Sequence, residues 1–265
     1  MKDKIILDFE NEEIYTVQGV SFKMILVEGG NFYMGADNGE RTIEEGLNWS
    51  KIKIDKTVQN YDEDACSDEA PVHMENLLDY YIGETVVTQE LWQAVMGNNP
   101  SHFKGLDRPV ENVNCKDCED FIARLNNMFP GKNFHLPKEA EWEYAARGGV
   151  KSKGYKYAGS NNIDEVAWYD DNSSMMETYP VKTKHPNELG IYDMSGNVAE
   201  WCRDRYDTYR SPFYKTKGIP GTKRVIRGGC YSQYCRITAR CGAPSSCRDA
   251  GIGFRIVRHP DLSDF

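Results

Sequence analysis

The sequence predicts an α+β fold with few short strands, two or three helices and much ordered loop. Helical patterns occur only between residues 87 and 149, and short apolar runs typical of strands lie before them and near the end of the chain. Residues 150–258 are rich in Gly, Asn, Asp, Ser and Pro. Because the backbone polar groups of so much loop must be satisfied, we expect metal ions or dense side-chain hydrogen bonding to hold it together.

The first 70 residues are predicted to hold strands and one long loop. Residues 1–20 are interpreted as an N-terminal arm or strand, and residues 21–35 as a hairpin whose turn is "EGG". Residues 36–70 show no periodicity and end in the acidic stretch "YDEDACSDEAP". We interpret them as a long loop that is functional, ordered by a metal or mobile.

Three segments have the apolar spacing of helices, namely 87–97, 114–131 and 134–149. Each begins at a capping residue or a proline, and two end at glycine. The boundary residues are Thr88 and Gly97, Asn114, and Pro137 with Gly148–Gly149. After them, only "GIGFRIVR" near the end of the chain has the pattern of a strand.

Charge is distributed unevenly along the chain. The net charge is −9, yet residues 201–258 contain 13 Lys/Arg against 3 Asp/Glu. A basic stretch can bind nucleic acid, whereas arginines can also be structural groups that bond loop carbonyls and carboxylates. These residues are mostly arginines spaced singly among Gly, Cys and Tyr, so we favour the structural interpretation over a nucleic-acid partner.

The apolar runs of the chain are short. Runs such as "MILV" and "VAWY" are far too short to span a bilayer, and the opening "MKDKIILDFENEE" lacks the apolar core of a signal peptide. We therefore expect a cytoplasmic protein, or a trimmed form of an exported one. The sequence does not specify how many copies of the chain associate. In a reducing compartment its cysteines would be thiols or metal ligands rather than disulfides.

Four of the eight cysteines lie in one stretch, "RGGCYSQYCRITARCGAPSSC", at residues 227–247. Cys230 and Cys235 have a C-x4-C spacing, and two thiolates can hold the soft ion copper(I). Cys241 and Cys247 are interpreted as buried or surface thiols. Cys115 and Cys118 form a C-x2-C pair, but no second pair or histidine pair lies at zinc spacing.

Several stretches that follow one another with ordinary spacings resemble the formylglycine-generating-enzyme, or sulfatase-modifying-factor, family. They are "MILVEGGNFYMG", "DEAPVHMENLLDYYIGETVVTQELW", "RPVENVNCKDCEDFIARLN", "FHLPKEAEWEYAARGG", "NELGIYDMSGNVAEWCRD", "RVIRGG" and "GIGFRIVR". The resemblance implies a C-type-lectin-like fold. It also implies one domain at residues 21–258, preceded by the arm at 1–20 and followed by a tail at 259–265.

The resemblance leaves two functions open. The enzymes of the family oxidise a cysteine of a sulfatase to formylglycine with copper(I) held by a C-x4-C pair, which carries over to Cys230 and Cys235. Here, however, Cys230 directly follows Gly229, three residues earlier than in the enzymes. Other members bind ligands, including variable proteins of diversity-generating retroelements, whose variable residues lie between "RGG" and "GFR".

Our leading hypothesis is a non-oxidase member that binds a small ligand or protein partner through the segment 230–250, and a variable protein of this kind is one form of it. The alternative is a copper-dependent oxidase that uses Cys230 and Cys235. Tyrosine and serine give contact area and adaptable hydrogen bonds, as in antibody paratopes. The predicted ligand-binding residues are Tyr231, Ser232, Gln233, Tyr234, Ser245, Ser246 and Asp249.

The resemblance also implies a structural calcium ion at "YDMSGNVAEW", because calcium prefers carboxylate and carbonyl oxygens. The carried-over ligands are the side chains of Asp193 and Glu200 and the carbonyls of Gly196 and Val198. In the alternative interpretation the stretch is a capped turn, in which Asn197 and Glu200 bond only backbone amides.

Overall fold

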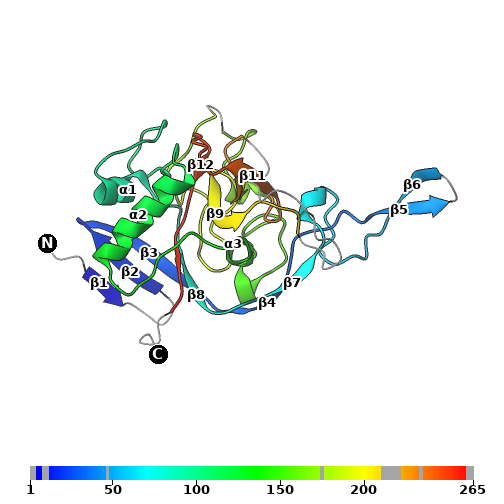
Figure 1. The fold of residues 1–265 in the computed structure, drawn as a ribbon, viewed down its shortest axis with the longest axis horizontal. Helices are drawn as coiled ribbons and strands as arrows, with labels where there is room; N and C mark the ends of the chain where they lie inside the picture. Colours follow the sequence, from blue (N-terminus) through cyan, green and yellow to red (C-terminus); the bar gives the residue numbers. More distant parts are fainter. Residues whose placement is uncertain are drawn as a thin grey trace.

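A computed structural model describes residues 4–7, 12–45, 48–173, 176–209, 222–232 and 235–260 of the chain. Its elements form four sheets, and helices contact three of them, in an α+β arrangement (Figure 1). The predicted α+β class is confirmed. Strands are more numerous in the described ranges than the sequence analysis expected.

The largest sheet joins segments from both ends of the described chain. Its strand order is β1-β2-β3-β8-β13, and all neighbouring strands are antiparallel. The strands β2 and β3 are joined by Gln18 and Gly19, which have φ values of 49° and 90°, as a tight hairpin turn requires. The bounds are β1 Lys4–Leu7, β2 Glu12–Val17, β3 Val20–Val27, β8 Tyr80–Gly83 and β13 Val257–Arg258.

The hairpin expected at residues 21–35 is wrong. β3 ends at Val27 and pairs with β2 and β8, whereas β4 (Gly30–Met34) pairs with β7 (His73–Leu77) in a separate two-stranded ribbon. "EGG" is therefore a crossing between two sheets. A Cβ atom on Gly29 would lie 2.4 Å from the Leu77 carbonyl oxygen, so this crossing requires glycine.

Residues 36–70 are more regular than the loop that we expected. They contain β5 (Glu40–Glu45) and β6 (Asn48–Ile54), which form an antiparallel hairpin that projects from the body of the molecule (Figure 1). A short 3-10 helix, η1 (Ser67–Glu69), follows before β7. Strands are predicted from an alternation of apolar and polar residues, and this signal is weak in the charged sequences of β5 and β6.

The three predicted helices are confirmed. Thr88 caps α1 (Gln89–Met96) by accepting the Leu91 amide hydrogen bond at 3.3 Å, and Gly97 ends it with a φ of 81°. Asn114 caps α2 (Cys115–Met128), and α3 (Glu139–Ala146) begins two residues after Pro137. Two shorter helices, η2 (Gly149–Lys151) and α4 (Ile163–Val166), follow. No helix in the described ranges is long and apolar enough to cross a membrane.

The first half of the domain is organised around an apolar core between α1, α2 and the large sheet. Trp92 of α1 stacks on Phe121 of α2 with ring centroids 5.4 Å apart, and Phe254 packs edge-on against both rings. The C-x2-C pair, Cys115 and Cys118, is part of this core. Burial raises the pKa of Cys115 to about 11 and that of Cys118 as well, which is the behaviour of structural thiols.

The second half contains a four-stranded sheet of order β11-β10-β9-β12, called the C-terminal sheet below. β10 is antiparallel to both β9 and β11, and β12 is parallel to β9. Sequence analysis expected little regular structure here, because residues 150–258 are rich in Gly, Asn, Asp, Ser and Pro and their apolar runs are short. The bounds are β9 Ala199–Arg205, β10 Lys223–Arg227, β11 Arg240–Pro244 and β12 Ile252–Gly253.

Five arginines of this half form buried ion pairs with glutamates from earlier in the chain. Arg255 donates to both carboxylate oxygens of Glu200, at 2.6 and 2.7 Å. The side chains of all five pairs are at most 7% exposed. The structural interpretation of the basic stretch is therefore confirmed for these arginines. The pairs are Arg227–Glu143, Arg236–Glu69, Arg240–Glu139, Arg255–Glu200 and Arg258–Glu13.

Candidate ligand-binding cleft

A cleft of about 540 Å³ opens at the connections that leave and enter the C-terminal sheet. Three of the residues predicted from the sequence, Cys230, Ser232 and Asp249, line it. Its other walls come from residues 66–69, from β9 and β10, and from the start of β11. They are Cys66, Asp68, Glu69, Ala199, Tyr206, Ile226, Gly229, Arg236, Ala239, Arg240, Cys241, Gly251 and Ile252.

The chain turns into this cleft at two glycines. Gly228 and Gly229 have φ values of 90° and 67°, and a Cβ atom on Gly228 would lie 3.0 Å from the Trp142 ring. The Tyr231 amide then donates to the Asn197 carbonyl at 3.0 Å. This turn directs the chain that follows β10 away from the sheet and places Cys230 and Ser232 on the wall of the cleft.

The other predicted ligand residues are arranged differently. The Tyr231 ring packs edge-on against Phe103, with centroids 5.6 Å apart, a contact that sequence analysis did not anticipate. Ser245 and Ser246 are not among the residues that line the cleft. The Ser245 carbonyl instead accepts from the Cys115 amide at the start of α2. Gln233 and Tyr234 lie outside the described residues.

Cys230 and Cys235 lie on different cavities. Cys230 is half-buried on the cleft, and its sulfur lies 3.2 Å from Ser232 Oγ. Cys235 is 2% exposed, and its thiol points at the Cys230 carbonyl oxygen, 3.9 Å away. It lines a neighbouring pocket of about 660 Å³ together with Tyr157 and Tyr169.

A shared copper ion requires two thiolates directed at one point. Burial, and then the nearby Cys230, raise the pKa of the Cys235 thiol, so its thiolate is disfavoured. In the structure each thiol contacts a different oxygen atom, Ser232 Oγ for Cys230 and the Cys230 carbonyl for Cys235, and the two cysteines line different cavities. All eight cysteines, each of which lies in a described range, are free of disulfide bonds.

The acidic segment that leads into η1 is paired in part with cations of the protein itself. Arg236 donates to Asp62 at 3.0 Å, to both carboxylate oxygens of Glu69 at 2.7 and 2.9 Å, and to the Asp64 carbonyl at 2.7 Å. Lys156 bonds Asp64 at 2.5 Å and lowers the pKa of that carboxyl. Asp62, Asp64 and Glu69 therefore each have a cationic partner within the protein.

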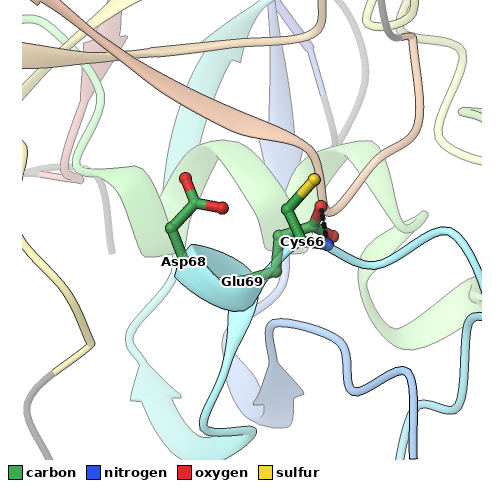
Figure 2. Close-up of side chains that lie close together, drawn as sticks. All are labelled: Cys66, Asp68 and Glu69. Carbon is green, nitrogen blue, oxygen red and sulfur yellow. Dashed lines mark hydrogen bonds between the residues drawn. The ribbon is translucent and has the colours of Figure 1, made fainter. Parts of the chain in front are cut away.

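Within the described ranges, one group of three side chains is close enough to hold a metal ion. Oxygen and sulfur atoms of Cys66, Asp68 and Glu69 lie within 4.8 Å of one another (Figure 2). Glu69 is already paired with Arg236, and it also accepts the Cys66 amide at 3.0 Å, drawn as the dashed line in Figure 2. Asp68 accepts from the Tyr206 hydroxyl at 2.6 Å. The group is a hydrogen-bonded wall of the cleft, and no spacing motif in the sequence connects Cys66 with Cys230.

The predicted calcium ligands Asp193, Gly196, Val198 and Glu200 are all buried around the start of β9. Asp193 Oδ2 accepts the Lys182 amide at 3.0 Å, and burial raises the pKa of its carboxyl to about 6. A buried carboxylate of this kind fits a hard cation.

Glu200 fits calcium less well than Asp193. Both of its oxygens are bonded by Arg255, and one also accepts from Trp142 Nε1 at 2.9 Å. Arg255 therefore supplies the positive charge that calcium would bring to this carboxylate. Glu200 bonds side chains, so the capped-turn alternative is wrong for that residue. The capped-turn alternative holds for Asn197, whose side chain bonds both the backbone amide and the backbone carbonyl of Tyr179.

Comparison with known proteins gives a consistent assignment. The model of the sulfatase-modifying factor enzyme 1-like domain matches residues 14–260. The "chaperone protein LppX" of Paenibacillus barcinonensis is 36% identical over an alignment of 234 residues that covers 69% of this chain and 81% of that protein. A formylglycine-generating enzyme of Streptomyces coelicolor is 37% identical over 179 residues, covering 59% of this chain and 54% of the enzyme.

Solved structures share the fold over nearly the whole chain. Treponema denticola variable protein 1 superposes with a TM-score of 0.72 at 32% identity, covering 94% of this chain and 99% of that one. PvdO from Pseudomonas aeruginosa superposes with a TM-score of 0.67 at 23% identity, covering 90% and 94%. The second of these likenesses concerns the fold alone.

Proposed function

This chain belongs to the family of sulfatase-modifying factor enzyme 1-like domains, and from that premise we propose that it is a ligand-binding member rather than an oxidase. The ligand, a small molecule or a protein segment, enters the cleft at Cys230, Ser232 and Asp249. The observation that carries the proposal is the cleft itself, which Cys230, Ser232 and Asp249 line, whereas Cys235 lines a neighbouring pocket.

The chemistry of the cleft supports binding. Arg236, Arg240 and Glu69 on its walls are paired within the protein, and Asp68 is bonded by Tyr206. Ala199, Ile226 and Ile252 add apolar surface. Hydroxyl and thiol groups remain to orient a ligand, which is typical of a binding pocket.

The likeness to Treponema denticola variable protein 1 supports the finer proposal that residues between Gly229 and Gly253 are variable. Arg227 and Arg255 hold the scaffold on either side of this segment through buried pairs with Glu143 and Glu200. Surface residues between them can therefore change without breaking those two pairs. Sequencing this segment in related isolates tests the proposal, because uniform sequences at Tyr231 and Ser232 would contradict it.

Ligand binding is tested with a random 12-residue peptide library displayed on phage and selected on the immobilised full chain. The indole of Ser232→Trp should occupy part of the cleft. We expect this variant to bind the selected peptides about tenfold less tightly or worse, and a tenfold loss of affinity corresponds to about 1.4 kcal/mol. Ser246→Trp, at an exposed position that does not line the cleft, is the matched control. Equal loss with both variants, or no loss with either, would contradict binding at the cleft.

The copper-dependent oxidase is the second candidate, favoured by the identity to formylglycine-generating enzymes and by the C-x4-C spacing. It predicts that one copper(I) ion binds per chain under anaerobic conditions and that Cys235→Ser abolishes this binding. Our proposal predicts that Cys235→Ser leaves copper(I) binding unchanged.

We also propose a structural calcium ion that uses Asp193 and the carbonyls of Gly196 and Val198. A ligand at 100 times its Kd stabilises a fold by about 2.7 kcal/mol. Calcium should therefore raise the Tm by several degrees over the value in a chelator, and Asp193→Asn should remove the difference. An identical Tm with calcium and with chelator would overturn this proposal.

A further inference from the structure

We infer that the ligand of the cleft extends into the neighbouring pocket of about 660 Å³, and that the part bound there is a positively charged group such as an ammonium or a guanidinium. This neighbour of the cleft is called the second pocket below. The inference rests on the proposed function, because it gives a chemical class to the ligand of the same site.

The first observation is that the two cavities adjoin. Cys66, Ser232 and Arg236 line both of them, and both cavities are open to solvent. The two cavities therefore have a common rim at these three residues. A ligand seated against Ser232 contacts this rim, so a molecule longer than the cleft continues over it into the second pocket.

The second observation is an aromatic wall in the second pocket. Tyr157 and Tyr169 line the pocket, and both residues are half-buried. The Tyr169 amide donates to Asn172 Oδ1 at 3.0 Å and its hydroxyl donates to Asp164 at 3.1 Å, so this ring is fixed at both ends. The electron-rich face of a tyrosine ring attracts cations.

The faces of these two rings are not used by cations of the protein. Lysines and arginines lie over several other tyrosines of the domain, as Arg258 lies over Tyr81 with 4.4 Å between the guanidinium carbon and the ring centroid. In the described part of the chain, none lies over Tyr157 or Tyr169. A cation brought by a ligand therefore finds these rings unoccupied.

The third observation is an excess of negative charge at the second pocket. Two cations of the protein, Arg236 and Lys156, pair with the three carboxylates of Asp62, Asp64 and Glu69. Two positive charges against three negative charges leave one negative charge over. Because Asp64 and Arg236 both line the second pocket, this excess lies at its wall.

Asp170 adds a further negative charge to the second pocket. It lines the pocket, it is exposed, and its carboxylate has no hydrogen-bond or ion-pair partner among the residues that the structure describes. Burial, and then Asp164, Asp171 and Asp170, raise the pKa of Tyr169 to about 12, which reflects the negative charge around that ring. One lysine, Lys184, also approaches this wall, where its Nζ bonds the Asp164 carbonyl at 2.7 Å.

The wall and the charge together favour a cationic group over a neutral or anionic one. A cation in the second pocket would face the unpaired carboxylate of Asp170 and the rings of Tyr157 and Tyr169. A neutral group gains neither of these attractions, and an anion is repelled by both. The cleft itself lacks such an aromatic pair, so charge selectivity belongs to the second pocket.

The test compares three probes of nearly equal shape and different charge, namely phenethylammonium, 2-phenylethanol and phenylacetate. Their binding to the full chain is measured by chemical-shift titration at low salt. Phenethylammonium should bind about fivefold more tightly than 2-phenylethanol, as one cation–π contact and one exposed ion pair together allow, and phenylacetate should bind least tightly. Equal affinity for the three probes would overturn the inference.

Variants locate the bound cation in the second pocket. Asp170→Asn should weaken phenethylammonium about threefold and change 2-phenylethanol less than about twofold, because only the cation loses an ion pair. Glu119→Gln removes one negative charge from an exposed position on α2, away from both cavities, and is the matched control. Equal weakening of phenethylammonium by both variants would contradict binding at Asp170.

The tyrosine ring is tested in the same way. Tyr169→Phe keeps the ring and should retain more affinity for phenethylammonium than Tyr169→Leu, which removes the ring, at equal Tm. If the two variants bind the probe equally, Tyr169 does not contact the cation and the aromatic part of the inference is overturned.

Two outcomes separate this inference from the proposed function. Displayed peptides that are weakened by Ser232→Trp should be enriched in lysine and arginine and should also be weakened by Asp170→Asn. If they show neither property, the inference is overturned and the proposed function stands. If no selected peptide depends on Ser232, the proposed function fails and the inference fails with it.

Discussion

Two regions of this domain differ in how much they rely on buried ion pairs. The region of α1, α2 and the large sheet is held mainly by apolar side chains such as Trp92, Phe121 and Leu125, with one buried pair between β13 and β2. The C-terminal sheet and its connections also bury apolar side chains, but they add four buried ion pairs between arginines and glutamates. Apolar burial leaves a periodic pattern in the sequence, whereas an ion pair requires only one arginine and one distant glutamate. The second mechanism therefore lets a segment fold without visible periodicity.

The largest effect is expected from breaking one ion pair of the C-terminal region on one side only. Arg255→Met leaves the Glu200 carboxylate buried without its cation and should lower the free energy of unfolding by about 3–5 kcal/mol. Urea denaturation measures this change.

A double variant shows whether the cost comes from charge or from packing. Arg255→Met combined with Glu200→Gln removes both charges and keeps an acceptor for Trp142. It should be more stable than Arg255→Met alone. If the double variant is less stable than the single one, buried charge is not what holds this region.

A smaller effect is expected in the apolar region. Leu125→Ala removes a fully buried side chain of α2 and should cost about 3 kcal/mol through lost burial and the cavity left behind. Measurement at low and high salt sharpens the comparison, since removal of an apolar group should depend little on ionic strength. A strong salt dependence of the Leu125→Ala effect would argue that the two regions are not stabilised differently.

The smallest perturbation is chemical labelling of thiols in the folded protein. Cys66 and Cys241 are exposed, Cys230 is half-buried, and all three line the cleft. Iodoacetamide should modify these three, whereas Cys115, Cys118, Cys202 and Cys235 are buried and should react only when the chain unfolds. Peptide mapping by mass spectrometry measures the order, and early modification of Cys235 would contradict the described loop.

The same contrast explains what could be predicted from the sequence. The helices were predictable because apolar spacing and caps such as Thr88 and Asn114 are local signals. The pairing of β4 with β7 could not be predicted. The sequence around Gly29 has the pattern of a hairpin turn, but in the structure the chain passes there from one sheet to another. Strand partners are non-local, and a short apolar run does not specify them.

The candidate site was predictable only in part. The segment 230–250 was identified from its place between "RGG" and "GFR", and three of its residues line the cleft. Cys66, Asp68 and Glu69 were missed because they come from a segment more than 100 residues earlier in the chain. Which cavity Cys230 and Cys235 each line depends on loop geometry, which a C-x4-C spacing does not determine.

The buried arginine pairs have a consequence for how the chain folds during its synthesis. Arg258 bonds Glu13 across 245 positions, and Arg236 bonds Glu69 across 167. Five glutamates destined for the interior are therefore made long before their arginines leave the ribosome. Such long-range contacts slow folding. Residues 227–258 supply all five arginines, so none of these pairs can form before that part of the chain has been made.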